Sequence, residues 1–180
     1  MERPKVDPGA SPPSVATSIP PLPPPHTRVG VGGVLVREEG RVLVNRAVYR
    51  SRFTIPSGYV EPGETLEGAL VREFVEETGV TVRVGRLLLT RHKVVRAGES
   101  DVFFAFALEH LAGEPTARPP EIAEVREVPV AEALEAPWIS ELSRMAIRLA
   151  RHEAAAWPRS AWKGGEARGL ASETYHLESL

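Results

Sequence analysis

The chain has 180 residues, 42% of them hydrophobic, which is enough for one well-filled core and too few for two full domains. The formal net charge of −2 gives no overall field that would gather nucleic acid or an anionic membrane, so an anionic substrate needs a local site. The absence of cysteine excludes disulfides, thiolate metal sites and cysteine nucleophiles. No segment resembles a signal peptide or a membrane span, so a cytoplasmic protein is expected.

Composition divides the chain into three segments. Residues 1–26 hold nine of the 17 prolines and almost no large apolar side chains, which predicts a disordered, Pro-rich leader. A PxxP ligand for a partner domain is the alternative interpretation of this segment. Residues 27–152 carry strand and helix patterns and form the predicted domain, and residues 153–180 are predicted to be a flexible C-terminal tail.

The domain is expected to contain strands before and after one well-defined helix. This helix is predicted over Thr65–Thr78, because Thr65 can cap its N-terminus and Gly79 suits the left-handed position that ends it. A hairpin precedes it, and a loop over 57–64 leads into it. The other elements expected are strands at 29–36, 41–49, 80–90, 101–109 and 124–130, a basic loop at 91–96, a helical turn at 131–135 and a helix at 138–151.

Three glutamates crowd together on the predicted helix. Glu73, Glu76 and Glu77 fall within one arc of about 100° of its surface, on which no Lys or Arg is expected. Two like charges about 4 Å apart repel by about 1 kcal/mol in water, a cost that a divalent cation would turn into attraction. The arc therefore predicts a site for Mg²⁺ or Mn²⁺ that acts on a phosphate. The opposite face is expected to pack through Val71, Phe74, Val75 and Thr78.

A longer pattern surrounds these glutamates. It consists of Gly58, Glu64, Arg72, Glu73, Glu76, Glu77 and Gly79 at fixed spacing, with Phe74 and Val80 at two apolar positions. This spacing matches Gx5Ex7REUxEExGU, the signature of the Nudix hydrolase family, and the sequence resembles that family over about residues 28–152. The resemblance implies an α/β protein with the Nudix fold, an α/β/α sandwich with a mixed central sheet. It also implies metal-dependent hydrolysis of a nucleoside diphosphate linked to another group.

The resemblance assigns a metal site to four residues. Glu76 and Glu77 match the principal metal ligands, and Glu73 matches a glutamate that binds metal or activates water. Gly58 matches a glycine whose backbone carbonyl joins the coordination shell. The implied cofactor is Mg²⁺, with Mn²⁺ as the alternative.

Other positions of the pattern have supporting roles by the same resemblance. Glu64 matches an acid near the metal, and Arg72 matches an arginine that orients the carboxylates. Ser57 and Phe74 depart from the commonest residues at their positions. Neither departure removes a metal ligand.

Residues outside the helix are candidates for substrate binding, and each has a second interpretation. Arg46 in the second strand would meet a phosphate or be an exposed strand arginine, and Arg52 would bind phosphate or keep its loop soluble. Tyr59 would stack on a base or ribose, or belong to the core. Glu121 lies where related enzymes often place a further metal ligand or base, the alternative being a solvated loop acid.

The expected function is that of a Nudix pyrophosphohydrolase acting on ADP-ribose, a nucleotide sugar, a dinucleotide or a nucleoside triphosphate. Glu73 or Glu121 would accept a proton from the attacking water, and metal on Glu76 and Glu77 would stabilise the departing charge. A non-catalytic nucleotide-sensing module and an RNA 5′-end pyrophosphohydrolase are the alternatives, the latter disfavoured by the lack of a long basic stripe. Pairing of the first strands is one route to a homodimer, and the fold class does not fix the substrate.

Overall fold

The computed structural model describes residues 26–151 and 172–176. The predicted leader lies outside these ranges except for His26, and the predicted tail lies outside them except for 172–176. The elements are β1 (His26–Arg37), η1 (Glu38–Gly40), β2 (Arg41–Ala47), β3 (Ser57–Tyr59), α1 (Leu66–Thr78), β4 (Thr81–Arg96), β5 (Glu99–Ala112), β6 (Ile122–Pro129), α2 (Val130–Glu135), α3 (Glu141–Arg151) and β7 (Ser172–His176).

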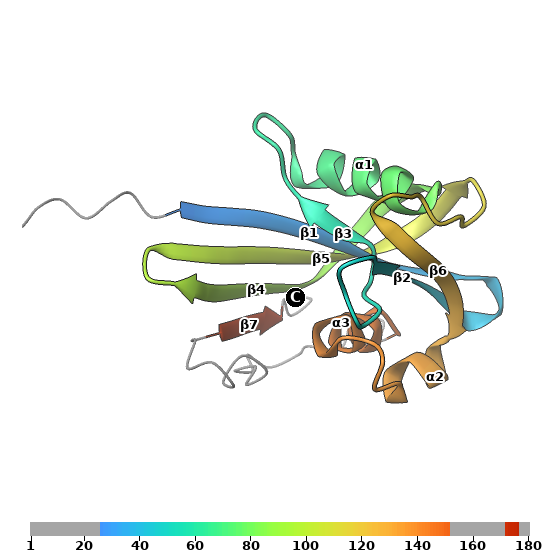
Figure 1. Ribbon diagram of the computed structural model, residues 1–180. Coiled ribbons are helices and arrows are strands. Elements are labelled where there is room, and N and C mark those ends of the chain that lie inside the picture. The colour runs from blue at the N-terminus through green and yellow to red at the C-terminus, as the bar shows by residue number, and fades with distance from the viewer. Residues whose placement is uncertain (1–25, 152–171, 177–180) are drawn as a thin grey trace, which may run out of the picture.

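The strands form one mixed sheet in the order β6-β2-β1-β5-β4-β7, with β3 paired to β1 beside this path. Strand β1 runs parallel to β5, whereas the other pairs are antiparallel. Helix α1 lies on one face of the sheet and helices α2 and α3 lie on the other (Figure 1). The predicted α/β/α sandwich with a mixed central sheet is therefore confirmed.

Two apolar clusters fill the space between the sheet and the helices. Strand β1 serves both, because its side chains alternate between the two faces. Val31 and Leu35 belong to the cluster beneath α1, while Val34 belongs to the cluster that contains the buried apolar residues of α3. All three are at most 1% exposed. Burying one such side chain contributes about 1.5–3 kcal/mol, so β1 is held by packing on both faces.

Helix α1 begins and ends as the sequence predicts. The Thr65 hydroxyl accepts a hydrogen bond from the Gly68 N–H at 3.0 Å, and Gly79 adopts φ = 75° at the other end. The face that packs differs from the prediction, because Val75 is 41% exposed. The buried residues are Ala69, Leu70, Phe74 and Thr78.

The predicted basic loop at 91–96 is wrong. These residues are the second half of β4, which pairs with β5 up to Arg96 opposite Glu99. The turn between the two strands is only Ala97–Gly98, and Gly98 has φ = 78°, which favours glycine. The charged side chains of 91–96 therefore project from a paired strand.

The start of α3 also differs from the prediction. Helix α3 begins at Glu141 rather than at 138, because the Trp138 carbonyl accepts a hydrogen bond from the Phe53 N–H at 2.8 Å. In the predicted tail, β7 pairs antiparallel with β4, from Leu89 opposite His176 to Lys93 opposite Ser172. The described helices include none with the length and hydrophobicity required to cross a bilayer.

Candidate active site

The close approach of Glu73 to Gly58 joins helix α1 to the sheet. Gly58 lies in β3, opposite Val31 of β1, at a point where the loop predicted over 57–64 begins with a short strand instead. A Cβ atom at position 58 would lie 1.9 Å from both Cδ and Oε1 of Glu73. Only glycine leaves room for the carboxylate at this point, so the spacing between Gly58 and Glu73 in the signature has a steric cause.

The Glu77 carboxylate is held in a fixed position at the inner side of α1. Its Oε2 accepts hydrogen bonds from the Asn45 side-chain amide and from the Ser57 backbone N–H, both at 2.8 Å. Burial raises the pKa of Glu77 to about 7, although these two hydrogen bonds lower it. Burial is also the main cause that raises the pKa of Glu73, against the nearby Arg72. Both carboxylates are thus poorly solvated.

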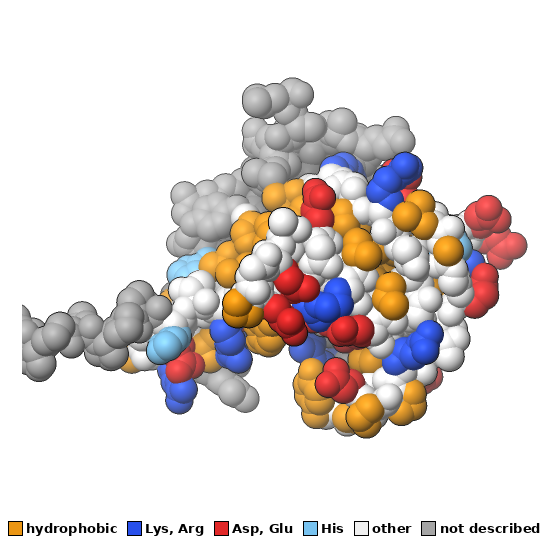
Figure 2. Space-filling view, turned by 90° about the horizontal axis from the view of Figure 1, so that it is seen from above, with side chains coloured by type: hydrophobic (Ala, Val, Ile, Leu, Met, Phe, Trp, Pro, Cys, Tyr) orange, Lys and Arg blue, Asp and Glu red, His pale blue; other side chains and the backbone are white. Residues whose placement is uncertain are grey.

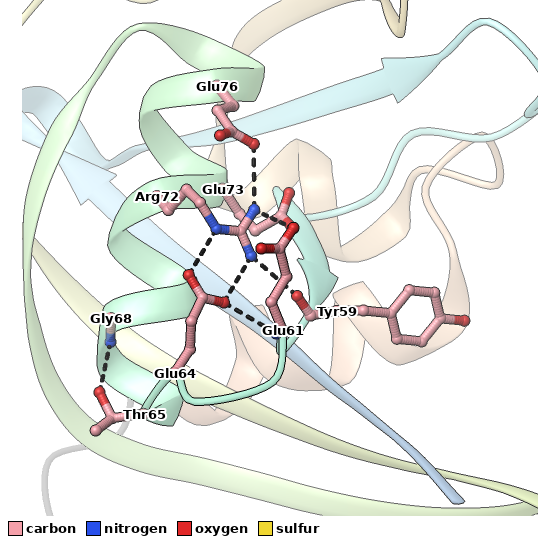
Figure 3. A network of polar contacts seen from close by, with 8 residues as sticks. All are labelled: Tyr59, Glu61, Glu64, Thr65, Gly68, Arg72, Glu73 and Glu76. Carbon is pink, nitrogen blue, oxygen red and sulfur yellow. Dashed lines mark hydrogen bonds and ion pairs between the residues drawn. The ribbon is translucent and has the colours of Figure 1, made fainter. Parts of the chain in front are cut away.

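The Arg72 guanidinium contacts three carboxylates and one backbone carbonyl (Figure 3). It donates to both oxygens of Glu64 at 2.8 and 2.9 Å, to Glu73 at 3.0 Å, to Glu76 at 3.2 Å and to the Tyr59 carbonyl at 3.0 Å. Arg72 thus lies beside the acidic arc and partly offsets the charge of its carboxylates. The bidentate pair with Arg72 is the main reason that the pKa of Glu64 falls to about 2.

The surface over α1 shows the same arrangement at larger scale. Seen from the α1 side, acidic side chains gather around basic ones (Figure 2). Glu76 is the most exposed of the three helix carboxylates, with 58% of its side chain accessible, whereas Glu73 retains 15%. The three glutamates therefore differ in environment: Glu76 faces solvent, and Glu73 and Glu77 face inward.

A cleft of about 570 Å³, which we call the main cleft, opens beside these inward carboxylates. Such a volume is within the range of small-molecule sites. Six of the residues predicted to form the site line it: Gly58, Glu73, Glu77, Glu121, Arg52 and Tyr59. The sequence-derived candidates, which come from a loop, a strand, a helix and a second loop, thus meet in one place.

Three candidates do not line the main cleft: Arg72, whose partners are given above, Glu76 and Arg46. Glu76 borders a smaller pocket of about 240 Å³, the side pocket, which shares Glu77 and Glu121 with the main cleft. Arg46 does not line the main cleft; it pairs with Glu124 at 3.3 Å, and its guanidinium lies 5.6 Å from the centre of the Phe53 ring. Arg46 is thus placed as a strand arginine with local partners.

Several residues at the site were not anticipated. Asn45 was missed. Its signal in the sequence is that this polar residue directly follows the apolar run Val42-Leu43-Val44 within a predicted strand. Asp101 and Arg91 also line the main cleft, and Arg118 borders the side pocket. Nothing local in the sequence distinguishes these three from other charged residues.

The carboxylates suit a divalent metal ion. Within the described part of the chain, no group of three or more His, Asp or Glu side chains is arranged to hold a metal ion by itself. Mg²⁺ commonly takes only one or two carboxylates and completes its shell with water and substrate phosphate. Glu73 and Glu77 offer such hard oxygen donors in one cleft, and a cation would offset the cost of burying their charge.

Comparisons with known proteins agree with this geometry. The NUDIX domain family matches residues 26–149. A MutT-like protein of Streptomyces ambofaciens is 43% identical over 77 residues, which are 43% of this chain and 47% of that protein. An ADP-ribose pyrophosphatase of Methanocaldococcus jannaschii is 35% identical over 92 residues, which are 49% of this chain and 54% of that protein. The chain thus spans about half the length of these two relatives.

The solution structure of the E. coli ORF135 protein has a TM-score of 0.58 at 26% identity, covering 73% of this chain and 98% of that one. Because the family match includes the whole signature and most of the chain, the chain belongs to the Nudix hydrolase family.

Proposed function

We propose that the chain hydrolyses a pyrophosphate bond in a nucleoside diphosphate linked to another moiety, using a divalent metal ion. The observation that carries this proposal is that Glu73 and Glu77 present poorly solvated carboxylates to a cleft of about 570 Å³ that also holds Arg50 and Arg52. Carboxylates for a metal and guanidinium groups for phosphate oxygens are the combination that phosphoryl transfer needs. The name of the archaeal relative supports ADP-ribose as one candidate substrate.

Each group of the chain would have a separate role. Mg²⁺ or Mn²⁺ would be held by four groups, the carboxylates of Glu73, Glu76 and Glu77 and the backbone carbonyl of Gly58. The metal would neutralise phosphate charge and lower the pKa of an attacking water. Arg72 keeps Glu73 and Glu76 in position through hydrogen bonds of 3.0 and 3.2 Å.

Proton transfer and phosphate binding fall to the rest of the cleft. Glu73 and Glu121 both line it and are the two candidates for accepting the proton of the water. Arg52 lies at the same cleft and would bind a phosphate oxygen, and Tyr59 offers a ring for the base or ribose. Single-turnover rates of Glu73→Gln and Glu121→Gln, each measured as a function of pH, distinguish the two candidates.

The test is a hydrolysis screen with Mg²⁺ and Mn²⁺. The substrates are nucleoside triphosphates, ADP-ribose, NADH, nucleotide sugars and dinucleoside polyphosphates. We expect turnover of at least one class and a loss of about 100-fold in Glu76→Gln and Glu77→Gln. Glu67→Gln is the matched control, since Glu67 is an exposed glutamate of the same helix outside both pockets. Full activity of both site variants, or no turnover of any pyrophosphate, would contradict the proposal.

A further inference from the structure

A second group of polar and aromatic side chains lies in the main cleft, on strands β4 and β5. Alternate residues of a strand share a face. Arg91 therefore lies on the same face as Leu89 of β4, and Asp101 and Phe103 lie on the same face as Ala105 of β5. Leu89 and Ala105 belong to the buried cluster on the α3 side of the sheet. The next residues on the same faces emerge from that cluster and line the cleft.

Arg91 and Asp101 form an ion pair that is largely removed from solvent. The Arg91 Nη2 lies 2.7 Å from the Asp101 Oδ1, and the side chains are 15% and 12% exposed. The desolvation of such a pair commonly offsets its Coulomb gain, so apolar residues would serve stability as well. Asp101 therefore invites a functional explanation. Among the described residues its Oδ2 accepts no hydrogen bond, and the residue borders the cleft.

Phe103 adds a flat apolar surface beside this pair. It pairs with Gly30 of the parallel strand β1 and with Arg91 of β4, whose guanidinium lies 5.6 Å from the ring centre. A Cβ atom on Gly32 would lie 2.5 Å from the ring, and one on Gly30 would lie 3.0 Å from it. The ring thus leans over two glycines, which leave it room at the wall of the cleft.

The geometry points to Asp101 as a residue that determines base specificity. This inference rests on the proposed function, because it assigns the base end of the same cleft. The base packs against Phe103, and its exocyclic amino group donates a hydrogen bond to the Asp101 carboxylate, which can only accept. Adenine, guanine and cytosine carry such an amino group. Uracil and thymine carry carbonyl oxygens in place of that amino group, which the carboxylate repels, and offer only the ring N3–H as a donor, so substrates with these two bases bind more weakly.

The direct test compares ADP-glucose with UDP-glucose, which differ only in the base. The wild-type chain is expected to prefer ADP-glucose in kcat/KM, and Asp101→Asn is expected to reduce that preference by about 10- to 100-fold, the value of a hydrogen bond to a charged group. The change lies in KM with kcat nearly constant, because the carboxylates proposed to hold the metal and the groups proposed to bind phosphate are unchanged. Glu99→Gln is the matched control: Glu99 pairs with Arg96 on the same hairpin, outside the cleft, and its variant keeps the wild-type preference.

Two additions keep the test decisive. Because Asp101→Asn leaves the Arg91 charge without its carboxylate, the neutral double variant Arg91→Gln with Asp101→Asn is measured beside it, and the same loss of preference is expected. Calorimetric titration with AMP and UMP reads base preference without hydrolysis, so an inactive chain that still prefers AMP contradicts the proposed function and supports this inference. Equal binding of AMP and UMP by the wild-type chain, or a preference that survives both variants, overturns it.

Discussion

At the scale of single residues, Gly58 has the least space for any added atom. In Gly58→Ala the new Cβ would lie 1.9 Å from the Glu73 carboxylate, so the carboxylate must move by more than a bond length. Displacing a group of the reaction by about 1 Å costs about 100-fold in rate, and we expect that loss in kcat/KM. Steady-state kinetics and thermal unfolding measured together check this. A fully active Gly58→Ala variant would show that Glu73 has no fixed role.

Glu64 is the residue that makes Arg72 a source of pH-dependent stability. Its pKa falls from 4.5 to about 2 in the folded chain, mainly because of its hydrogen bonds from Arg72. A lowered folded pKa means that this stabilisation is complete above pH 4.5 and is lost as the pH falls through about 2. We therefore expect the denaturant midpoint of Glu64→Gln to lie below that of the wild type at pH 7 and to approach it between pH 4.5 and 2. Glu67→Gln is the control, and a gap that is independent of pH would contradict the assignment.

At the scale of elements, helix α1 depends on its N-cap. The Thr65 hydroxyl accepts from the Gly68 N–H at 3.0 Å and satisfies one of the free donors of the first turn. Thr65→Ala removes this acceptor and is expected to lower the free energy of unfolding by about 1 kcal/mol, whereas Thr65→Ser keeps it and stays near the wild type. Urea unfolding of both variants measures the difference. Equal destabilisation by serine and alanine would mean that the methyl group, not the cap, matters.

An element could be predicted where its cause lies in neighbouring residues, and could not where its cause lies in a distant strand. The ends of α1 were predicted correctly because a cap and a left-handed glycine are set by the few residues around them. The prediction ends strand β4 at Thr90, six residues too early, because most of the residues from Arg91 to Arg96 are basic. Those charges are accommodated by pairing with β5 and by partners such as Asp101 and Glu99. A strand of this kind is recognisable only once its partner strand is in place.

At the scale of the whole molecule, the acidic half of the site could be predicted and the other half could not. The spacing from Gly58 to Glu77 is a local pattern, and β3 with α1 brings those residues together directly. Asp101 and Phe103 reach the same cleft through the parallel pairing of β1 with β5, which joins residues more than seventy positions apart. No periodicity in the sequence specifies that register. The proposed reaction class therefore rests on a local sequence pattern, while the wall that would select a substrate needs the fold.

The assembled site also predicts that metal binding stabilises the whole chain. Glu73 and Glu77 are buried beside each other's charge, and a cation bound between them would favour the folded state by mass action. At free Mg²⁺ of about 100 times Kd the stabilisation is about 2.7 kcal/mol. Thermal unfolding in EDTA and in Mg²⁺ should therefore show a rise in Tm for the wild type and for Glu67→Gln. Glu77→Gln keeps an oxygen for the Asn45 and Ser57 donors and loses only the charge, so its rise should be much smaller. An equal rise in all three proteins would place the bound metal elsewhere and leave these carboxylates without their proposed role.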